Sequence, residues 1–173
     1  MAKIITVFFS MKGETYVNGS IVNLSKGNTN VAAEFVLEAV GGDMFEIEAV
    51  REYSKDHFTM IEEAKEELKK GKLPAIKKFM DNLEEYDIIF LGYPNWWGTL
   101  PMPVVTFLSH YDWTGKKIIP FCSNEGSGLG KSVNDIKKFC PNAVIKEGIS
   151  IHGADTQKLK AQIMNWAKNQ IKE

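Results

Sequence analysis

Cysteine, histidine and arginine are all scarce in this chain of 173 residues. Its two cysteines, Cys122 and Cys140, lie too far apart for a CxxC motif, and its three histidines show no metal-ligand spacing. We therefore expect a reduced chain without a metal site. Arg51 is the only arginine and the net charge is −1, so the chain lacks the basic patch that is typical of nucleic-acid-binding proteins.

Long hydrophobic runs are also missing. The apolar run at residues 4–9 is too short to cross a membrane, and no small-residue cleavage site of a signal peptide accompanies it. We therefore expect a cytoplasmic protein with no membrane partner. Hydrophobic residues make up 44% of the chain and charged residues 25%, which excludes a disordered or fibrous protein. This length predicts a single domain, residues 1–173.

Five short segments have the composition of β-strands. Three are nearly continuous apolar runs, typical of strands that are buried on both faces, and two carry more charge and fit flanking strands. Pro120 lies within one of the apolar runs, although proline has no N–H to donate and is usually kept to edges or bulges. In chain order, the predicted strands are residues 3–9, 43–50, 87–93, 117–122 and 143–151.

Stripes of apolar residues at helical spacing separate the predicted strands. Gly41-Gly42 is expected to end the first helix, and Thr59-Met60-Ile61-Glu62 has the form of a capping box at the start of the second. Pro74 and Pro103 can each open a further helix. The apolar stripes extend over residues 31–40, 61–68, 76–83, 104–108, 129–140 and 159–171.

Strands that alternate with helices along the whole chain predict an α/β fold with a parallel sheet and helices on both faces. Five strands in one small domain fit a doubly wound sheet with the order 2-1-3-4-5. In such sheets a ligand binds beyond the carboxyl ends of the strands, at the switch between the first and third strands. The loops after the first, third and fourth strands are therefore the candidate binding loops.

The first of these loops contains two stretches suited to hold a phosphate, Ser10-Met11-Lys12-Gly13-Glu14-Thr15 and Ser25-Lys26-Gly27-Asn28-Thr29. Only the second precedes a helical stripe, whereas the first leads into a predicted hairpin with an Asn18-Gly19 turn. We expect Ser10 and residues 27–30 to hold the phosphate, because helix N–H groups and the helix dipole stabilise an anion. The alternative is that Asn28 or Thr29 only caps the helix.

The second loop, Pro94-Asn95-Trp96-Trp97-Gly98, contains two adjacent tryptophans that cannot both enter one hydrophobic core. A tryptophan in a loop that contains glycine suits a flat isoalloxazine ring. The indole offers an aromatic surface to the face of the ring, and the loop backbone offers N–H and C=O partners to its pyrimidine edge. The alternative is that one indole packs in the core and the other is exposed.

The third loop begins at Ser123 and contains Gly126-Ser127-Gly128-Leu129-Gly130-Lys131-Ser132. The last three of these residues match the Gly-Lys-Ser end of a P-loop. The first glycine of that motif would fall at Glu125, and P-loops usually follow the first strand. No G-x-G-x-x-G follows the first strand either. We therefore expect neither an NTPase nor a Rossmann dinucleotide-binding protein. None of the three loops offers a convincing nucleophile–base pair, so no catalytic residue is predicted.

Together these residues resemble the flavodoxin-like FMN-binding proteins over essentially the whole chain. The resemblance is carried by Ser10, Lys26-Gly27-Asn28-Thr29, residues 86–98, and residues 115–121 with the Glu125-Gly126-Ser127-Gly128 stretch that follows. It implies FMN as the cofactor, with the phosphate on the first loop, the ring on the second and the third loop over the pyrimidine side. The site residues that it implies are Ser10, Lys12, Gly27, Asn28, Thr29, Asn30, Pro94, Asn95, Trp96, Trp97, Gly98, Ser123, Asn124, Glu125, Gly126, Ser127 and Gly128.

The chain departs from the electron-carrying flavodoxins in two ways. Residues between Met11 and Lys26 interrupt the compact phosphate loop, and the net charge of −1 lacks the strong acidity that helps such carriers dock to basic partners. The leading interpretation is an FMN protein in electron transfer, with a redox partner protein or a small electron acceptor. The alternative is an FMN-dependent NAD(P)H:quinone-type oxidoreductase, and a more remote one is a flavin-free interaction domain.

Overall fold

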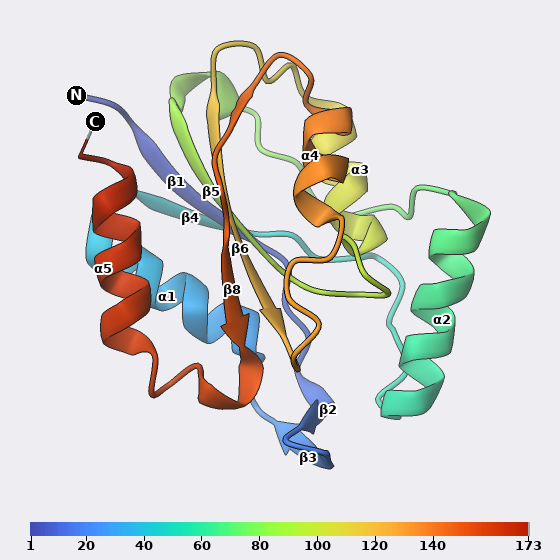
Figure 1. The fold of residues 1–173 in the computed structure, drawn as a ribbon. Helices are drawn as coiled ribbons and strands as arrows, with labels where there is room; N and C mark the ends of the chain where they lie inside the picture. Colours follow the sequence, from blue (N-terminus) through green and yellow to red (C-terminus); the bar gives the residue numbers. More distant parts are fainter. Residues whose placement is uncertain (173) are drawn as a thin grey trace.

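Three apolar runs form the centre of a parallel sheet in the computed structural model of the chain, which describes residues 1–172 (Figure 1). They are β1 (Ile4–Phe8), β5 (Ile88–Pro94) and β6 (Lys117–Asn124), and nearly all of their side chains are buried. Helices cover both faces of these strands, so both faces are apolar. The predicted strands at residues 3–9, 87–93 and 117–122 are confirmed.

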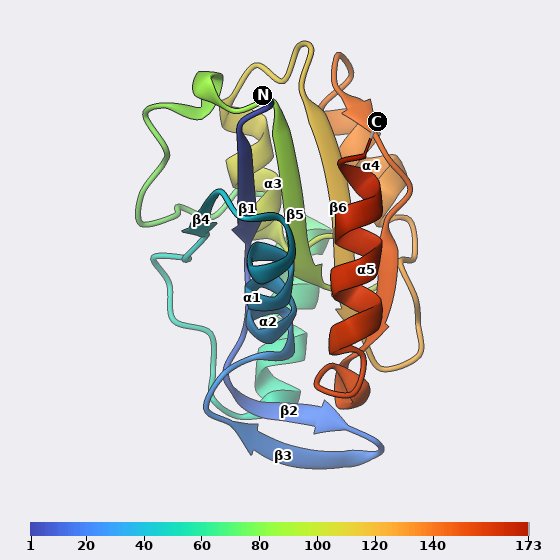
Figure 2. The same cartoon turned by 90° about the vertical axis from the view of Figure 1, so that its left-hand side faces the viewer.

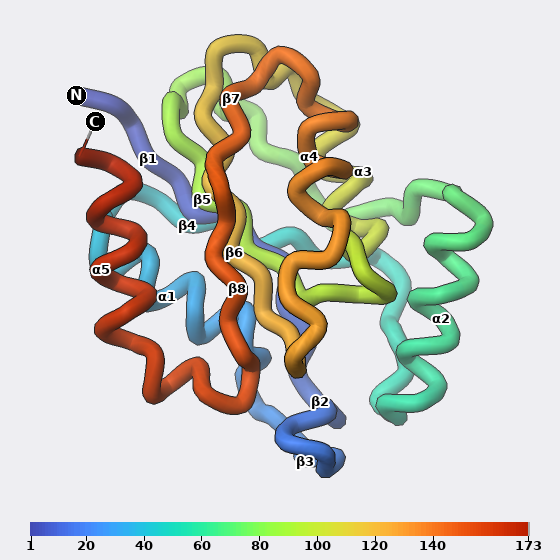
Figure 3. The backbone as a smooth tube through the Cα atoms, viewed as in Figure 1, coloured from blue at the N-terminus to red at the C-terminus, as the bar shows by residue number. Residues whose placement is uncertain are grey.

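The sheet has six strands rather than the five that the sequence predicts. Its order is β4-β1-β5-β6-β7, and a further strand, β8, also pairs with β6. The predicted strand at residues 143–151 is divided into β7 (Val144–Ile145) and β8 (Ile149–His152), which follow one another along β6 (Figure 3). The parallel α/β class is confirmed, whereas the count of five strands and the simple order 2-1-3-4-5 are wrong because of this division. β4 (Asp43–Glu46) is shorter than predicted.

Pro120 accounts for the division between β7 and β8. The carbonyl group of Ile118 accepts a hydrogen bond from the Lys146 N–H at 2.9 Å, so Ile118 presents its backbone groups to β7. Pro120 lies two residues further along β6, so its backbone groups point to the same side of the strand as those of Ile118. Because proline has no N–H group, one hydrogen bond to the neighbouring strand is missing there. β7 pairs with residues before Pro120 and β8 with residues after it. Gly148 lies between β7 and β8, and a Cβ atom there would lie 2.8 Å from the Pro120 carbonyl oxygen.

The helices cover the two faces of the sheet in pairs. α1 (Asn28–Val40) and α5 (Lys160–Gln170) lie in front of the sheet in Figure 2, and α3 (Met102–His110) and α4 (Ser132–Phe139) lie behind it. On the first face, small residues such as Ala32 and Ala167 allow the helices to approach the buried rings of Phe90 and Phe121. No helix within residues 1–172 is long and apolar enough to cross a membrane.

α2 (His57–Lys70) begins earlier than the sequence predicts. The capping box at Thr59 is wrong, because Asp56 is the N-cap residue: its carboxylate accepts hydrogen bonds from the Thr59 N–H at 2.9 Å and from the Thr59 hydroxyl at 2.7 Å. Aspartate is among the strongest N-cap residues, and its charge also favours the positive end of the helix dipole.

The helix predicted over residues 76–83 does not form. Instead, the Val50 N–H donates to the Ala75 carbonyl group at 3.0 Å and the Lys77 N–H donates to the Glu48 carbonyl group at 2.8 Å. The segment therefore satisfies its backbone against residues 48–50 rather than against itself, and only a short 3₁₀ turn, η1 (Leu83–Glu85), follows. A second 3₁₀ turn, η2 (Gly153–Asp155), follows β8.

The predicted hairpin is confirmed as β2 (Gly13–Val17) and β3 (Ser20–Leu24), which pair with each other and not with the central sheet. Asn18 and Gly19 form its turn with φ angles of 50° and 81°, the left-handed conformation that a two-residue hairpin turn requires. The hairpin projects beyond the carboxyl ends of the central strands (Figures 1 and 2).

We expect Gly148→Ala to destabilise the protein by about 1–3 kcal/mol, because a methyl group there would be forced against Pro120. Urea unfolding followed by far-ultraviolet circular dichroism measures the change. Glu147→Ala at the exposed neighbouring position is the control and should shift the free energy of unfolding by less than about 0.5 kcal/mol. Equal stabilities for the two variants would contradict the close approach at Gly148.

Candidate functional site

A cleft with a volume of about 250 Å³ opens at the carboxyl ends of the central strands. Its walls come from the hairpin, from the first turns of α1 and α2, and from the loops after β5 and β6, so the structure brings the three candidate loops together. The cleft is lined by Met11, Glu14, Thr15, Tyr16, Asn28, Thr29, His57, Met60, Ile61, Pro94, Asn95, Trp96, Ser123, Asn124, Glu125, Ser127 and Gly153.

The predicted site residues divide into two groups. Those that line the cleft are Asn28, Thr29, Pro94, Asn95, Trp96, Ser123, Asn124, Glu125 and Ser127. Those that lie outside its lining are Ser10, Lys12, Gly27, Asn30, Trp97, Gly98, Gly126 and Gly128. Most of the second group shape the loops that carry the first group.

The start of α1 depends on a close backbone crossing at Gly27. A Cβ atom at Gly27 would lie 2.2 Å from the Met11 carbonyl oxygen and 2.3 Å from the Ser10 hydroxyl oxygen, so only glycine fits there. The Ser10 hydroxyl oxygen accepts a hydrogen bond from the Asn30 N–H at 3.1 Å. Among residues 1–172, the N–H groups of Asn28 and Thr29 donate to no protein acceptor, as expected for the first turn of a helix. These two donors and the helix dipole favour an anion at this end of the cleft.

The Thr29 side chain joins two loops and does not cap the helix. Its hydroxyl group forms a hydrogen bond with the Ser123 hydroxyl group at 2.6 Å, and both residues are buried. The N-cap residue is Gly27, which has no side chain that could cap the helix. The interpretation of Asn28 or Thr29 as a simple helix cap is therefore wrong.

The two adjacent tryptophans point in different directions because Trp97 and Gly98 form a tight turn. Trp96 and Thr99 exchange two backbone hydrogen bonds at 3.1 and 3.2 Å, and the φ angles of Trp97 and Gly98 are 56° and 82°. A positive φ angle is unusual and costly for a bulky residue. The Trp97 indole leaves the cleft, donates a hydrogen bond to the Ile61 carbonyl group at 2.7 Å and is 45% exposed.

Trp96 is the indole at the cleft. It packs edge-to-face against Phe9 and Tyr53, with ring centroids 5.3 and 5.2 Å away. The Tyr53 hydroxyl group donates in turn to the buried Glu67 carboxylate, and burial together with this hydrogen bond raises the pKa of Tyr53. A fixed aromatic wall therefore stands at one side of the cleft.

Asn95 and Asn124 fix the shapes of the second and third loops. The Asn124 side-chain oxygen accepts hydrogen bonds from the Gly126 and Gly128 N–H groups at 2.9 and 3.0 Å. The Asn95 amide group donates to the Gly128 carbonyl group at 2.8 Å, and its oxygen accepts from the Gly98 N–H at 2.8 Å. The predicted glycines of these loops therefore serve loop geometry.

Comparison with known proteins identifies the family. A family model described as flavodoxin matches residues 20–170. The chain belongs to the flavodoxin family. The crystal structure of a candidate flavoprotein from Bacteroides eggerthii shares 29% sequence identity with this flavodoxin-family chain, covers 94% of it and 98% of its own length, and superposes with a TM-score of 0.72. No curated protein sequence matches significantly.

Two further structures show the same fold. A candidate flavoprotein from Bacteroides uniformis is 26% identical, with 94% of this chain and 97% of that chain covered and a TM-score of 0.73. A flavoprotein from Lactobacillus acidophilus in complex with FMN is 16% identical, with 91% of this chain and 98% of that chain covered and a TM-score of 0.65. At that identity the second likeness concerns the fold alone.

A further wall of the cleft, not predicted from the sequence, is built by the hairpin and α2 of this flavodoxin-family chain. The Glu14 carboxylate accepts a hydrogen bond from the His57 N–H at 2.9 Å, and the Tyr16 ring stacks on the His57 ring with centroids 5.9 Å apart. Glu14 and Tyr16 share one face of β2, which the period of two in a strand predicts, but their contact with α2 has no local signal. The His57 Nδ1 atom is buried without a partner among residues 1–172, which fits a ligand that completes this wall.

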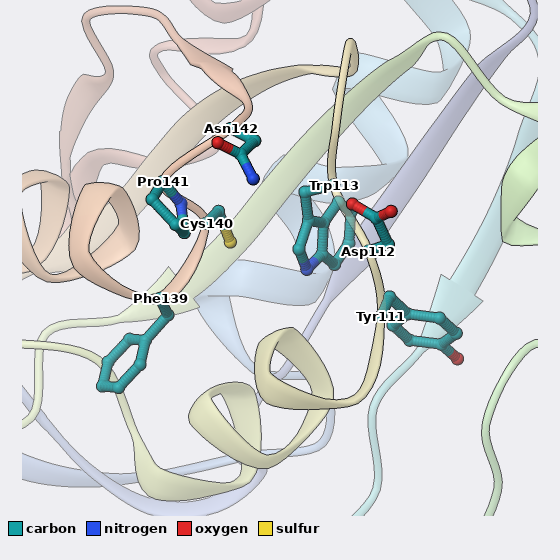
Figure 4. A pocket seen from close by; sticks show the side chains of 7 residues that line it. All are labelled: Tyr111, Asp112, Trp113, Phe139, Cys140, Pro141 and Asn142. Carbon is teal, nitrogen blue, oxygen red and sulfur yellow. The ribbon is translucent and has the colours of Figure 1, made fainter.

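The two cysteines are buried free thiols. Cys122 and Cys140 are buried, and burial raises the pKa of each to about 12, so neither forms a thiolate at neutral pH. Cys140 borders a second hollow of about 140 Å³ at the amino ends of the strands (Figure 4). This hollow contains no predicted site residue. Its lining is Tyr111, Asp112, Trp113, Phe139, Cys140, Pro141 and Asn142.

Proposed function

We propose that the cleft binds FMN and that the chain acts in electron transfer as a flavodoxin-type redox protein. The observation that carries this proposal is the pairing, in one cleft, of two free N–H groups at the start of α1 with the fixed indole of Trp96. One end suits a phosphate and the other suits a flat aromatic ring. Membership of the flavodoxin family and the FMN complex of the Lactobacillus acidophilus neighbour support the same cofactor.

The residues of the cleft fit the parts of this cofactor. Asn28 and Thr29 would hold the phosphate through their N–H groups, with Ser10 and Asn30 keeping the helix start in place. Pro94, Asn95 and Trp96 would contact the ring. The third loop would close over the pyrimidine edge through Ser123, Asn124 and Ser127, while the Glu125 carboxylate lies nearer the start of α1. We add Tyr16 and His57 to the site and leave out Trp97, whose indole lies on α2.

A bound flavin supplies the redox chemistry, and the protein supplies binding, orientation and electrostatics. The hairpin and α2 form one wall of the cleft, and Trp96 forms the aromatic wall. The buried tyrosine and thiol nearest the strand ends, Tyr93 and Cys122, have raised pKa values because of burial, and we give them no proton-transfer role.

A second candidate function is an FMN-dependent oxidoreductase of the NAD(P)H:quinone type. The observation that favours it is His57, whose buried Nδ1 atom has no partner among the described residues and which lines the cleft beside the stacked Tyr16 ring. A polar group of a second substrate would complete this hydrogen bond. We rank this function below electron transfer because no nicotinamide-nucleotide motif is present in the sequence.

We expect the protein to bind one FMN per chain, because the cleft offers one anion site and the sequence contains no pyrophosphate-binding glycine motif. The visible spectrum of the purified protein and chromatography of the flavin released by acid test this. FMN should be the main flavin that is recovered. Recovery of mainly FAD would contradict the proposed cofactor, and failure of added FMN to bind would contradict the proposed function.

Trp96→Leu should weaken FMN binding about tenfold, because aromatic stacking is worth about 0.5–1.5 kcal/mol beyond buried area. Trp97→Leu is the matched control and should leave the dissociation constant nearly unchanged, since its indole lies outside the cleft. Quenching of flavin fluorescence measures both constants, and unfolding curves confirm that the variants are folded. A larger loss in the Trp97 variant would reverse our assignment of the two indoles.

For an electron carrier, we expect NADH or NADPH alone to reduce the bound flavin slowly and a separate flavoprotein reductase to reduce it quickly. Anaerobic stopped-flow absorption at the flavin band compares the two rates. Rapid direct reduction by a nicotinamide nucleotide, followed by rapid reoxidation by a quinone, would replace the carrier with the oxidoreductase.

A further inference from the structure

His152 lies between two carboxylates at the end of β8. Its Nδ1 atom is 3.1 Å from an Asp155 carboxylate oxygen, and its Nε2 atom is 3.1 Å from a Glu125 carboxylate oxygen. Asp155 belongs to η2 and Glu125 to the loop after β6, so the imidazole joins two separate elements. The side chains are partly exposed, at 36% for His152, 26% for Glu125 and 41% for Asp155, so solvent protons reach them.

Glu125 is also placed beside the first turn of α1. Gly153, the residue after His152, lies against both groups: a Cβ atom there would be 2.7 Å from the Asn28 side-chain nitrogen and 3.0 Å from a Glu125 carboxylate oxygen. Asn28 is the first residue of α1, and its N–H group is one of the two that have no protein acceptor within residues 1–172. The Glu125 carboxylate therefore stands next to the place that we propose for the phosphate.

A carboxylate at this position opposes a phosphate, because like charges at short range repel one another. The charged groups that face His152 are Glu125 and Asp155, and Lys158 lies behind Asp155 with its Nζ atom 4.0 Å from the carboxylate. The Asn18 N–H at the hairpin tip, 3.4 Å from Glu125, is neutral. The proton on His152 is consequently the charge that offsets Glu125.

We propose that protonated His152 neutralises Glu125 and so permits tight binding of the phosphate group of FMN, and that this binding weakens when the imidazole loses its proton. The inference rests on the proposed function, since it concerns the phosphate of the same cofactor. It makes Glu125 and His152 determinants of specificity for the phosphorylated flavin over riboflavin, which has no phosphate.

The direction of the pH dependence follows from linkage. The hydrogen bond with Asp155, and then the charges of Glu125 and Asp155, raise the pKa of His152 above its ordinary value of 6.5. A nearby phosphate dianion favours the protonated form further, so FMN must bind more tightly to that form. A phosphate monoester has a second pKa of about 6, so the ligand is mainly a dianion above pH 6.5. Above pH 6.5, the change in FMN affinity with pH therefore comes from the titration of His152.

The test is to measure dissociation constants of FMN and of riboflavin with the apoprotein of this chain from pH 6.5 to 9. We expect FMN to bind about tenfold more weakly at the upper end, equivalent to a shift of about one pH unit in the His152 titration on binding. Riboflavin should show no such change. Nuclear magnetic resonance of the His152 ring, assigned by its absence in His152→Gln, should show that titration moving upward by about one unit when FMN is added.

Two variants should change FMN affinity in opposite directions. His152→Gln should bind FMN about tenfold more weakly at pH 6.5 and lose the pH dependence, whereas Glu125→Gln should bind it more tightly at pH 9. His110→Gln and Glu84→Gln make the same changes on α3 and η1, outside the cleft, and should match the unaltered protein.

The outcomes separate this inference from the proposed function. FMN binding that does not vary with pH, or equal losses for FMN and riboflavin in His152→Gln and Glu125→Gln, would overturn the role of the His152–Glu125 pair and leave FMN binding intact. Failure of the unaltered protein to bind either flavin would overturn the proposed function itself.

Discussion

One buried hydrogen bond, between the hydroxyl groups of Thr29 and Ser123, connects the start of α1 to the end of β6. The two residues are 94 positions apart in the chain, and the parallel pairing of β1, β5 and β6 brings them to the same edge of the sheet. Because the bond is buried, removing either partner would leave an unpaired hydroxyl group beneath the cleft. The floor of the cleft and the position of the free N–H groups of α1 both depend on this contact.

Much of the fold is readable from local patterns. The apolar runs of β1, β5 and β6 indicate buried strands, and the Asn18-Gly19 pair specifies the hairpin turn. Other features depend on partners that are distant in sequence. Residues 76–83 have an apolar stripe, yet the backbone there pairs with residues 48–50. Pro120 can be seen in the sequence. The division of the strand at residues 143–151 into β7 and β8 cannot be predicted from it, because that requires knowing which side of β6 the backbone groups of Pro120 face.

The candidate site also combines features that local patterns predict with features that depend on residues distant in sequence. The loops that meet at the cleft could be predicted from the topology of a parallel sheet, and their glycines and polar residues could be named from the sequence. Which tryptophan reaches the cleft could not, because that depends on the positive φ angles of the Trp97-Gly98 turn. The contribution of His57 could not be predicted either, since nothing in the sequence reveals that the hairpin packs on α2.

Gly27 lies directly against Ser10 and Met11, so the two ends of the segment that contains the hairpin meet. The chain leaves the end of β1, forms the whole hairpin and returns to within contact of its point of departure before α1 begins. A segment whose two ends already touch can lengthen, shorten or change sequence without moving the strand before it or the helix after it. The hairpin can therefore evolve separately from the rest of the site. Changes in it alter which molecules can approach the cleft, while the end of β1 and the start of α1 keep their positions.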